Sequence, residues 1–249
     1  MMRKLFGSLI LALALGLPAA LGLSSVPARA DPPTPVVIEM FTSQGCASCP
    51  PADLLMQGWA NDRQVIALSL HVDYWDYLGW RDTFAKRGHT DRQQAYAKYS
   101  GSRQVYTPQA VVNGQYIAVG SNREAVEAAV RSAMKDRQLA LKAERDADGK
   151  PLRLAIPGRR EWEGEATIWL CLFDKRHDVT VQRGENSGKS LSYVNVARAW
   201  IDLGRWTGEA ATLDLTPKLV SYDWDNRGAV VMVQAKKGQI LGAIDLGGK

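Results

Sequence analysis

Two cysteines with two residues between them, Cys46 and Cys49, constrain this chain more than any other feature of its sequence. An apolar run from Val36 to Phe41 precedes them and is long enough for one buried strand. A helix-like segment, Pro50 to Ala60, follows. Near a helix N-terminus the free N–H groups and the helix dipole stabilise a thiolate, and a second thiol close by can resolve a mixed disulfide formed by the first. The spacing therefore predicts a redox-active pair.

Two prolines, Pro50 and Pro51, directly follow Cys49. Proline is tolerated only in the first helical turn, and it disfavours helical geometry in the residue before it. We therefore expect the helix to begin at Pro50 and Cys46 to lie in the loop before it. In that position the helix dipole has a weaker effect on the pKa of Cys46.

The first 30 residues predict a signal peptide. Arg3 and Lys4 precede an apolar stretch, Leu5 to Leu23, and Ala28 to Ala30 has the small-x-small pattern of a cleavage site. We expect cleavage after Ala30, a periplasmic or secreted protein, and no stable membrane insertion afterwards. A retained membrane anchor is the alternative, although no other long apolar stretch follows.

The charge of the remaining chain is nearly balanced. Without Arg3, Lys4 and Arg29, the 31 basic residues become 28 against 26 acidic ones, a formal charge of +2. This balance gives no reason to expect a nucleic acid or an anionic membrane surface as partner. In an oxidising compartment a close cysteine pair is normally a disulfide. The third cysteine, Cys171, lies in an apolar run and is expected to be a buried, inert thiol.

Hydrophobic patterning divides the chain at about residue 137. The first part predicts a parallel βαβ unit, a polar and aromatic insert with a helix, a hairpin at an Asn-Gly turn and a final helix. These elements are expected at Val36–Phe41, Pro50–Ala60, Val65–Val72, Asp73–Arg103 (helix from about Thr90, with a Thr90/Gln93 capping box), Ala110–Val112, Tyr116–Val119 and Ser121–Arg137 (Ser121/Glu124 capping box).

From Gln138 onward, short segments alternate with a period of two and are separated by turn residues, which indicates an antiparallel β-sandwich. The expected strands are Leu139–Ala143, Leu152–Ile156, Ala166–Phe173, Val179–Gln182, Ala211–Leu215, Ala229–Ala235 and Ile240–Leu246.

Four segments resemble known sequences: FTSQGCASCPPAD, HVDYWDYLGWRD, YTPQAVVNG and RGENSGKSLSYVNVAR. Residues 36–137 resemble the thioredoxin-like superfamily, and the whole chain resembles an exported bacterial thioredoxin-like family that carries a domain of unknown function. The resemblance implies a thioredoxin-like α/β domain (βαβ, helical insert, ββα) over 36–137, followed by a β-sandwich domain over 138–249. It also implies that Cys46 is the nucleophile and Cys49 the resolving thiol, and that Thr107 and the cis-proline Pro108 bind substrate.

Four further residues are candidates for accessory roles. His71, Asp73 and Trp75 follow the end of the second strand, at the sheet edge where the first strand also ends, and therefore near Cys46. His71 could relay protons, or it could be a histidine satisfied by a neighbour. Glu39, seven residues before Cys46, is either a buried acid that takes the proton of the resolving thiol or a group that faces solvent or pairs with an arginine.

The loop Gly184–Ser190 is not a phosphate-binding loop, because three residues separate its glycines where the motif requires four. It is a turn between strands or a site for a ligand or partner, and Asn195 and Arg198 could support it. A sandwich domain beside a redox domain would bind a protein partner or shield the active-site edge.

We expect a thiol–disulfide oxidoreductase that acts on exported protein thiols and disulfides and exchanges electrons with a redox partner protein. Its cofactor is its own Cys46–Cys49 disulfide, with no bound metal. One alternative is a copper- or zinc-binding module that uses the same cysteines with His71 or His89. The other is a binding protein whose disulfide is only structural.

Overall fold

A mixed sheet of eight strands runs through the part of the chain that the structure, a computed structural model, describes: residues 34–102, 104–219 and 222–247. The predicted signal peptide and its cleavage site lie outside these residues. The strand order is β11-β10-β7-β8-β2-β1-β3-β4. In chain order these strands are β1 (Val36–Thr42), β2 (Val65–His71), β3 (Gln109–Val112), β4 (Tyr116–Val119), β7 (Ala166–Thr180), β8 (Ser190–Trp206), β10 (Arg227–Ala235) and β11 (Ile240–Gly247).

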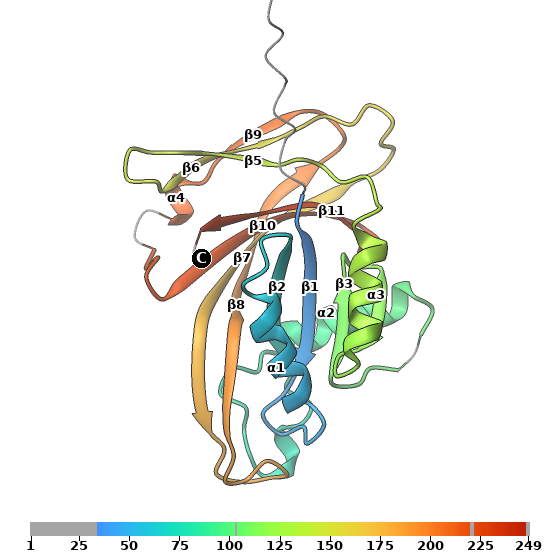
Figure 1. The fold of residues 1–249 in the computed structure, drawn as a ribbon. Helices are drawn as coiled ribbons and strands as arrows, with labels where there is room; N and C mark the ends of the chain where they lie inside the picture. Colours follow the sequence, from blue (N-terminus) through green and yellow to red (C-terminus); the bar gives the residue numbers. More distant parts are fainter. Residues whose placement is uncertain (1–33, 103, 220–221, 248–249) are drawn as a thin grey trace, which may run out of the picture. The chain divides into compact units, whose positions relative to one another are not determined.

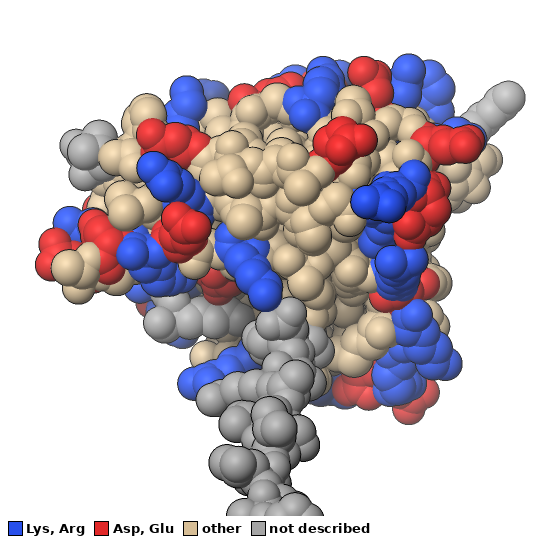
Figure 2. All heavy atoms as spheres, turned by 90° about the horizontal axis from the view of Figure 1, so that it is seen from above, with Lys and Arg blue, Asp and Glu red and all other residues tan. Residues whose placement is uncertain are grey.

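A second sheet has three antiparallel strands in the order β5-β6-β9. They are β5 (Lys142–Arg145), β6 (Pro151–Ile156) and β9 (Ala211–Asp214). This sheet lies at the upper end of the molecule in Figure 1. Seen from above in Figure 2, acidic and basic side chains alternate around the edge of that face, and uncharged side chains fill its centre. Positive and negative side chains are thus interspersed on this face, in keeping with the small net charge of residues 31–249.

Helices cover both faces of the large sheet (Figure 1). Successive side chains of β1 point to opposite faces and so pack against different helices. Ile38 and Met40 pack against α1 (Pro50–Trp59) and α3 (Arg123–Ala133). Val37 and Phe41 point the other way, towards α2 (Arg87–Tyr99). Every residue of β1 is buried, as expected for a strand covered on both faces. Two short helices complete the described elements: η1 (Asp76–Leu78) and α4 (Thr216–Leu219).

The two halves of the sequence meet inside the large sheet. Strand β8 lies parallel to β2, with Ser69 opposite Val196. Side chains reinforce this short pairing, since the Ser69 hydroxyl donates to the carbonyl of Val194 at 2.8 Å and the Asn195 amide donates to the carbonyl of Ala67 at 2.9 Å. Strands β7, β10 and β11 then continue the same sheet outward from β8.

The predicted fold class is therefore wrong. The described chain is not a thioredoxin-like α/β domain followed by a separate antiparallel β-sandwich, because one mixed sheet contains strands from both parts. Residues 32–249 also form one compact unit. The period-two pattern indicated strands that overlap β5, β6, β7, β9, β10 and β11, but it missed β8. The expected separate strand Val179–Gln182 is the end of β7 and the start of the turn after it. A pattern within one strand also says nothing about which distant strand it pairs with.

Helix α1 begins at Pro50 as predicted, with Cys49 as its N-cap. The predicted start of α2 is wrong, because this helix begins at Arg87. Thr90 and Gln93 do not form a capping box: the Thr90 hydroxyl donates to Asp73 at 2.6 Å, and the Gln93 amide donates to the carbonyl of Tyr106 at 2.8 Å. Both side chains tie α2 to neighbouring segments instead.

The N-cap of α3 is Asn122 rather than the predicted Ser121, and its Oδ1 accepts from the backbone N–H of Ala125 at 3.0 Å. The predicted hairpin at Asn113–Gly114 is confirmed between β3 and β4. Both residues have positive φ, 45° and 69°, as such a turn requires. A Cβ on Gly114 would lie 1.9 Å from the carbonyl oxygen of Gly238, so only glycine fits there.

Candidate functional site

Cys46 and Cys49 form a disulfide in the loop between β1 and α1. Cys46 lies in a turn that follows the end of β1, and Cys49 caps the helix, so Cys46 is outside the first helical turn as expected. Both residues are buried, with 1% of Cys46 and none of Cys49 exposed. Cys171 is a separate, buried free thiol in β7, and burial raises its pKa.

Hydrogen bonds from the insert after β2 hold the cysteine loop. The backbone N–H of Gln44 donates to Oδ2 of Asp82 at 2.7 Å. The Gln44 side chain is fully buried and accepts from the indole N–H of Trp80 at 2.8 Å. The insert therefore fixes the backbone two residues before Cys46.

The turn between β7 and β8, in the second part of the chain, also holds the cysteine loop. The buried amide of Asn186 donates to the carbonyls of Gln44 at 3.0 Å and of Cys46 at 2.9 Å. Glu185 accepts from the backbone N–H of Ala47 at 3.3 Å. Figure 1 shows how the two long strands reach down to the end of β1. The polar groups of this turn thus support the cysteine loop. Asn195 and Arg198, which we expected to support the turn, instead bond Ala67 and pair with Asp174.

Thr107 and Pro108 lie beside the cysteine loop, and the peptide bond between them is cis. The Ser48 hydroxyl lies 3.4 Å from both the Sγ of Cys46 and the carbonyl oxygen of Thr107. The indole N–H of Trp75 donates to the Thr107 hydroxyl at 2.7 Å. The structure therefore brings together Cys46, Thr107 and Trp75, and both polar groups of Thr107 that face this region have partners within the chain.

Asp53 lies one helical turn after Cys49, and its backbone N–H donates to the Cys49 carbonyl at 3.1 Å. Its side chain is buried, with Oδ1 accepting from the Thr42 hydroxyl at 2.7 Å. Oδ2 has no hydrogen-bond partner among the described residues. Burial raises the pKa of Asp53 to about 7, against opposing effects of His71 and of the Thr42 hydroxyl. This carboxyl can therefore gain or lose a proton near neutral pH.

His71 lies on the same face of the sheet as Asp53. Its Nδ1 is 2.7 Å from Oδ2 of Asp82, the oxygen that also accepts from Gln44. Burial raises the pKa of Asp82, but the charge and hydrogen bond of His71 and two backbone N–H donors hold it below the usual value. Nε2 of His71 has no partner among the described residues, and neither has the hydroxyl of Tyr193, whose ring lies 4.6 Å from that of His71. The two ring nitrogens of His71 thus differ, because Nδ1 is hydrogen-bonded to Asp82 and Nε2 has no partner among the described residues.

Two of the predicted accessory residues lie elsewhere. Glu39 points to the opposite face of the sheet and forms a buried ion pair with Arg92, with Nε 2.5 Å from Oε1. The prediction left this arginine pairing open, and the structure shows it. Asp73 accepts from Thr90 and anchors α2. Neither carboxyl is placed to exchange a proton with Cys49.

No group of three His, Cys, Asp or Glu side chains within the described residues is arranged to hold a metal ion. His89 is buried, with Nδ1 2.9 Å from the carbonyl of His71, and burial lowers its pKa to about 4.

Asp53, Asp82 and Asn186 were not among the predicted site residues. Asp53 had a usable signal, because a residue four positions after a cysteine in a helix lies on the same helix face. Its position in the first helical turn is also where acids commonly complement the helix dipole, so the sequence offered no reason to single it out. Asn186 belongs to the polar Gly184–Ser190 loop that the sequence singled out, but neither it nor Asp82 could be placed at the cysteine loop, since they reach it from 142 and 38 positions away.

Fold and site together define a mixed β-sheet protein with a buried C-x-x-C disulfide at the start of a helix whose first turn holds a buried acid, one oxygen of which has no partner among the described residues. The chain belongs to the family described as "Protein of unknown function (DUF1223)", whose model matches residues 37–234. The expected resemblance is thus confirmed at the level of a family of unknown function. The comparisons do not test the resemblance to the thioredoxin-like superfamily, which stays a prediction.

Two solved structures are similar to this one. Protein AGR_C_4864 from Agrobacterium tumefaciens is 30% identical, with a TM-score of 0.74 over 88% of this chain and 97% of that one. HBP35 of Porphyromonas gingivalis is 12% identical, with a TM-score of 0.58 over 87% of this chain and 76% of that one, and shows the fold alone. No curated protein matches the chain.

Proposed function

We propose that this protein is an exported thiol–disulfide oxidoreductase in which Asp53 exchanges a proton with the resolving thiol of Cys49. The single observation that supports this most is the buried Oδ2 of Asp53, which has no partner among the described residues. An unpaired buried carboxyl is unfavourable for stability. A disulfide that only braces the fold has no use for one, whereas a resolving thiol needs a proton acceptor.

The reaction requires no cofactor beyond the cysteines. The Cys46 thiolate attacks a substrate disulfide, so that a mixed disulfide forms and one substrate sulfur leaves as a thiolate. Cys49 then gives its proton to the Asp53 carboxylate and attacks Sγ of Cys46. This closes the Cys46–Cys49 disulfide and releases the second substrate thiolate. The reverse sequence oxidises substrate thiols, and the reduction potential of the pair decides the direction.

Substrate must reach a sulfur that is almost fully covered. Trp75 lies against the loop, because a Cβ on Gly45 would be 3.2 Å from the Cβ of Trp75. The turn that contains Asn186 covers the other side. Exchange therefore needs one of these two segments to move. An apolar surface for an incoming protein chain is offered by Tyr106 (36% exposed) and Val119 (49% exposed), which lie close to Pro108 in the chain and in the sheet, respectively.

The test is to trap the mixed disulfide. The reduced mature protein with Cys49→Ser should stay linked to a disulfide-containing substrate such as oxidised glutathione or insulin, as shown by an added mass. The Cys46→Ser variant should not, and Cys171→Ser should resemble the wild type. Turnover in an insulin reduction assay should be lost in both active-site variants. If Cys46→Ser forms the adduct as readily as Cys49→Ser, the assignment of the nucleophile fails.

The near-complete burial of Cys46 favours a second candidate: a binding protein with a purely structural disulfide. In that case Cys46→Ser lowers stability, typically by about 2–4 kcal/mol, and the pair resists reduction. Exchange kinetics with glutathione separate the two, since a structural disulfide does not turn over.

A further inference from the structure

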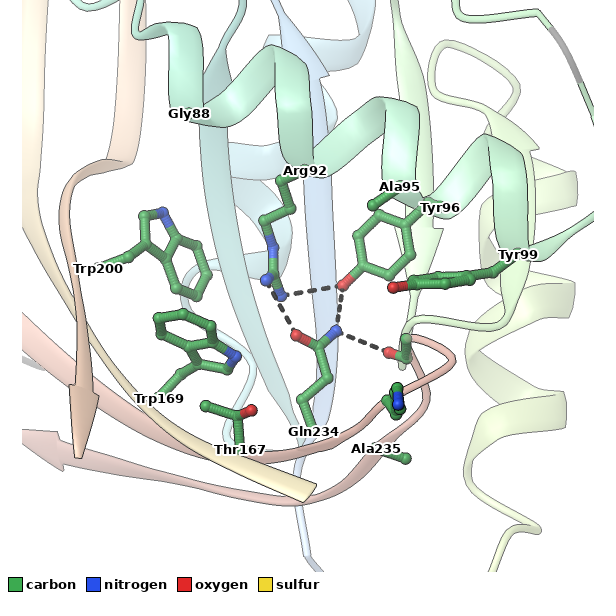
Figure 3. A pocket seen from close by; sticks show the side chains of 12 residues that line it. Gly88, Arg92, Ala95, Tyr96, Tyr99, Thr167, Trp169, Trp200, Gln234 and Ala235 are labelled. Atoms are coloured by element: carbon green, nitrogen blue, oxygen red, sulfur yellow. Dashed lines mark hydrogen bonds between the residues drawn. The ribbon is translucent and has the colours of Figure 1, made fainter. Parts of the chain in front are cut away.

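On the other face of the sheet, a cavity of about 450 Å³ lies between α2 and the strands β7, β8 and β10. One side of α2 forms its roof through Gly88, Arg92 and Tyr99, residues spaced so that they share one helix face. Trp169, Trp200 and Gln234 come from the strands (Figure 3). Its volume is within the range of sites for small organic ligands, which bury most of the ligand against apolar and aromatic side chains.

Aromatic rings stand on both sides of the cavity. Trp169 and Trp200 lie on one side and Tyr96 and Tyr99 on the other, as Figure 3 shows. The two tryptophan rings are edge to face with centroids 6.4 Å apart. Tyr99 is 48% exposed, so its ring is available for contact. A flat ring can stack on or meet these surfaces edge-on.

The charge of Arg92 in the roof of the cavity is balanced, but its hydrogen-bond donors are not all used. Arg92 is paired with the buried Glu39, and its guanidinium lies 4.2 Å from the centre of the Trp200 ring. Nη1 donates to Oε1 of Gln234 at 2.9 Å and retains a second N–H group. Arg92 lines the cavity and its side chain is 14% exposed, so part of this side chain is accessible to a ligand.

Lys236 lies at the rim of the cavity, in the turn between β10 and β11, and is exposed. It has no ionic partner among the described residues. No acidic side chain lines the cavity. Arg205, which donates to Thr167 at the same rim, is itself paired with Asp202 at 3.1 Å. The unbalanced charge at this opening is therefore positive, which disfavours a cation and favours an anion.

We infer that this cavity binds a small aromatic monoanion, a flat ring system with one carboxylate or equivalent group. The ring lies between the tryptophan and tyrosine sides, and the anionic group meets the free N–H of Arg92 and the ammonium of Lys236. The site is independent of the disulfide, which lies at the end of β1 and on the α1 side of the sheet.

The probes are 2-naphthoate, the neutral 2-naphthylmethanol and the cationic 2-naphthylmethylamine, titrated into the mature protein by calorimetry or ligand-detected NMR. These compounds share a ring system and differ in charge. We expect 2-naphthoate to bind with a dissociation constant of about 1 mM or lower, and the other two at least about five-fold more weakly. Equal binding of all three would overturn the choice of an anion.

Two variants place the binding in this cavity. Lys236→Gln should weaken 2-naphthoate binding by about three- to five-fold, the scale of a partly exposed ion pair, and leave 2-naphthylmethanol unchanged. The neighbouring Lys237→Gln, which does not line the cavity, is the matched control. Ala95→Trp should fill the space and abolish binding of every probe, whereas Gln94→Trp on the exposed side of α2 should not. Undiminished binding in Ala95→Trp, or no 2-naphthoate binding by the wild type, would overturn the proposal.

Discussion

Glu39 and Asp53 are both buried carboxyls in or near β1, but they lie on opposite faces of the sheet and differ in how many of their oxygens have partners. Glu39 has Arg92 and the Tyr96 hydroxyl as partners. Asp53 has only the Thr42 hydroxyl, and one of its oxygens has none among the described residues. The comparison teaches that a buried acid supports the fold when its charge is fully matched, and is available for proton transfer when it is not.

Removal of the partner of Glu39 should have the largest effect. Arg92→Met retains most of the stem but leaves the Glu39 carboxylate buried and unpaired, which should lower the free energy of unfolding by about 3–5 kcal/mol. Urea unfolding at pH 7 measures this value. The control is Arg87→Met on the same helix, whose ion pair with Asp91 is exposed and worth less than about 1 kcal/mol. Similar values for the two variants would show that the Glu39 pair is not critical.

Asp53→Asn should act in the opposite direction. The folded-state pKa of Asp53, about 7, lies above the unfolded value, so the unfolded state releases this proton first as the pH rises. The free energy of unfolding of the wild type therefore falls between about pH 4 and pH 7, and the asparagine variant escapes this loss. We expect the variant to be more stable by about 2–4 kcal/mol at pH 8 and nearly equal to the wild type at pH 4.

Unfolding curves at these two pH values test that difference. Glu124→Gln, an exposed carboxyl on α3, is the control and should change stability by less than about 0.5 kcal/mol at either pH. An Asp53→Asn variant that is destabilised at pH 8 would mean that the charged carboxylate is matched by groups we have not identified.

The same substitution should slow exchange. Loss of a general base typically lowers a rate by about 100-fold, and we expect this for the release of glutathione from its mixed disulfide with Cys46 at pH 7.5. The difference should disappear well above the usual thiol pKa of about 8.5, where Cys49 ionises without help. Rapid mixing with mass detection follows the step. Glu39→Gln is the matched control, and an equal loss of rate in that variant would contradict a specific role for Asp53.

The tyrosines beside the two acids should show the smallest effects and sharpen the contrast. The Tyr96 hydroxyl bonds Glu39 and accepts from Gln234 at 2.8 Å, so Tyr96→Phe should lower the free energy of unfolding by about 1.5–3 kcal/mol. The Tyr193 hydroxyl has no partner among the described residues, so Tyr193→Phe should change it by less than about 0.5 kcal/mol. Thermal or urea unfolding compares them. A costly Tyr193→Phe would show that this hydroxyl is bonded in solution.

Local features were predictable from the sequence, and long-range ones were not. The buried strand before Cys46, the helix start at Pro50 and the Asn113–Gly114 turn each follow from a few adjacent residues, and all three are present. Strand β8 (Ser190–Trp206) was not among the expected strands, and its pairing with β2 joins residues more than 120 positions apart through a single short stretch. This pairing joins four strands of the second part to the sheet of the first part, which makes the expected fold class wrong.

The candidate site shows the same division. The cysteines and Thr107–Pro108 were identified from local motifs. The alternation along β1 indicates that the Glu39 side chain lies on one face of the sheet, but not whether that face carries α1 or α2. The sequence therefore left both the proton-transfer role and the arginine pairing of Glu39 open. Asn186, which holds the Cys46 carbonyl, belongs to a turn whose polar residues suggested a ligand. Only the folded arrangement distinguishes a support from a binding loop.

The reduction potential of the Cys46–Cys49 pair tests the central claim most directly. The mature protein is equilibrated in glutathione buffers of graded potential, and its free thiols are counted by mass, with Cys171→Ser as background to remove the third thiol. A potential between about −120 and −270 mV, the range of dedicated exchange proteins, is the predicted result. A potential below about −300 mV, where structural disulfides lie, would contradict the proposed exchange activity.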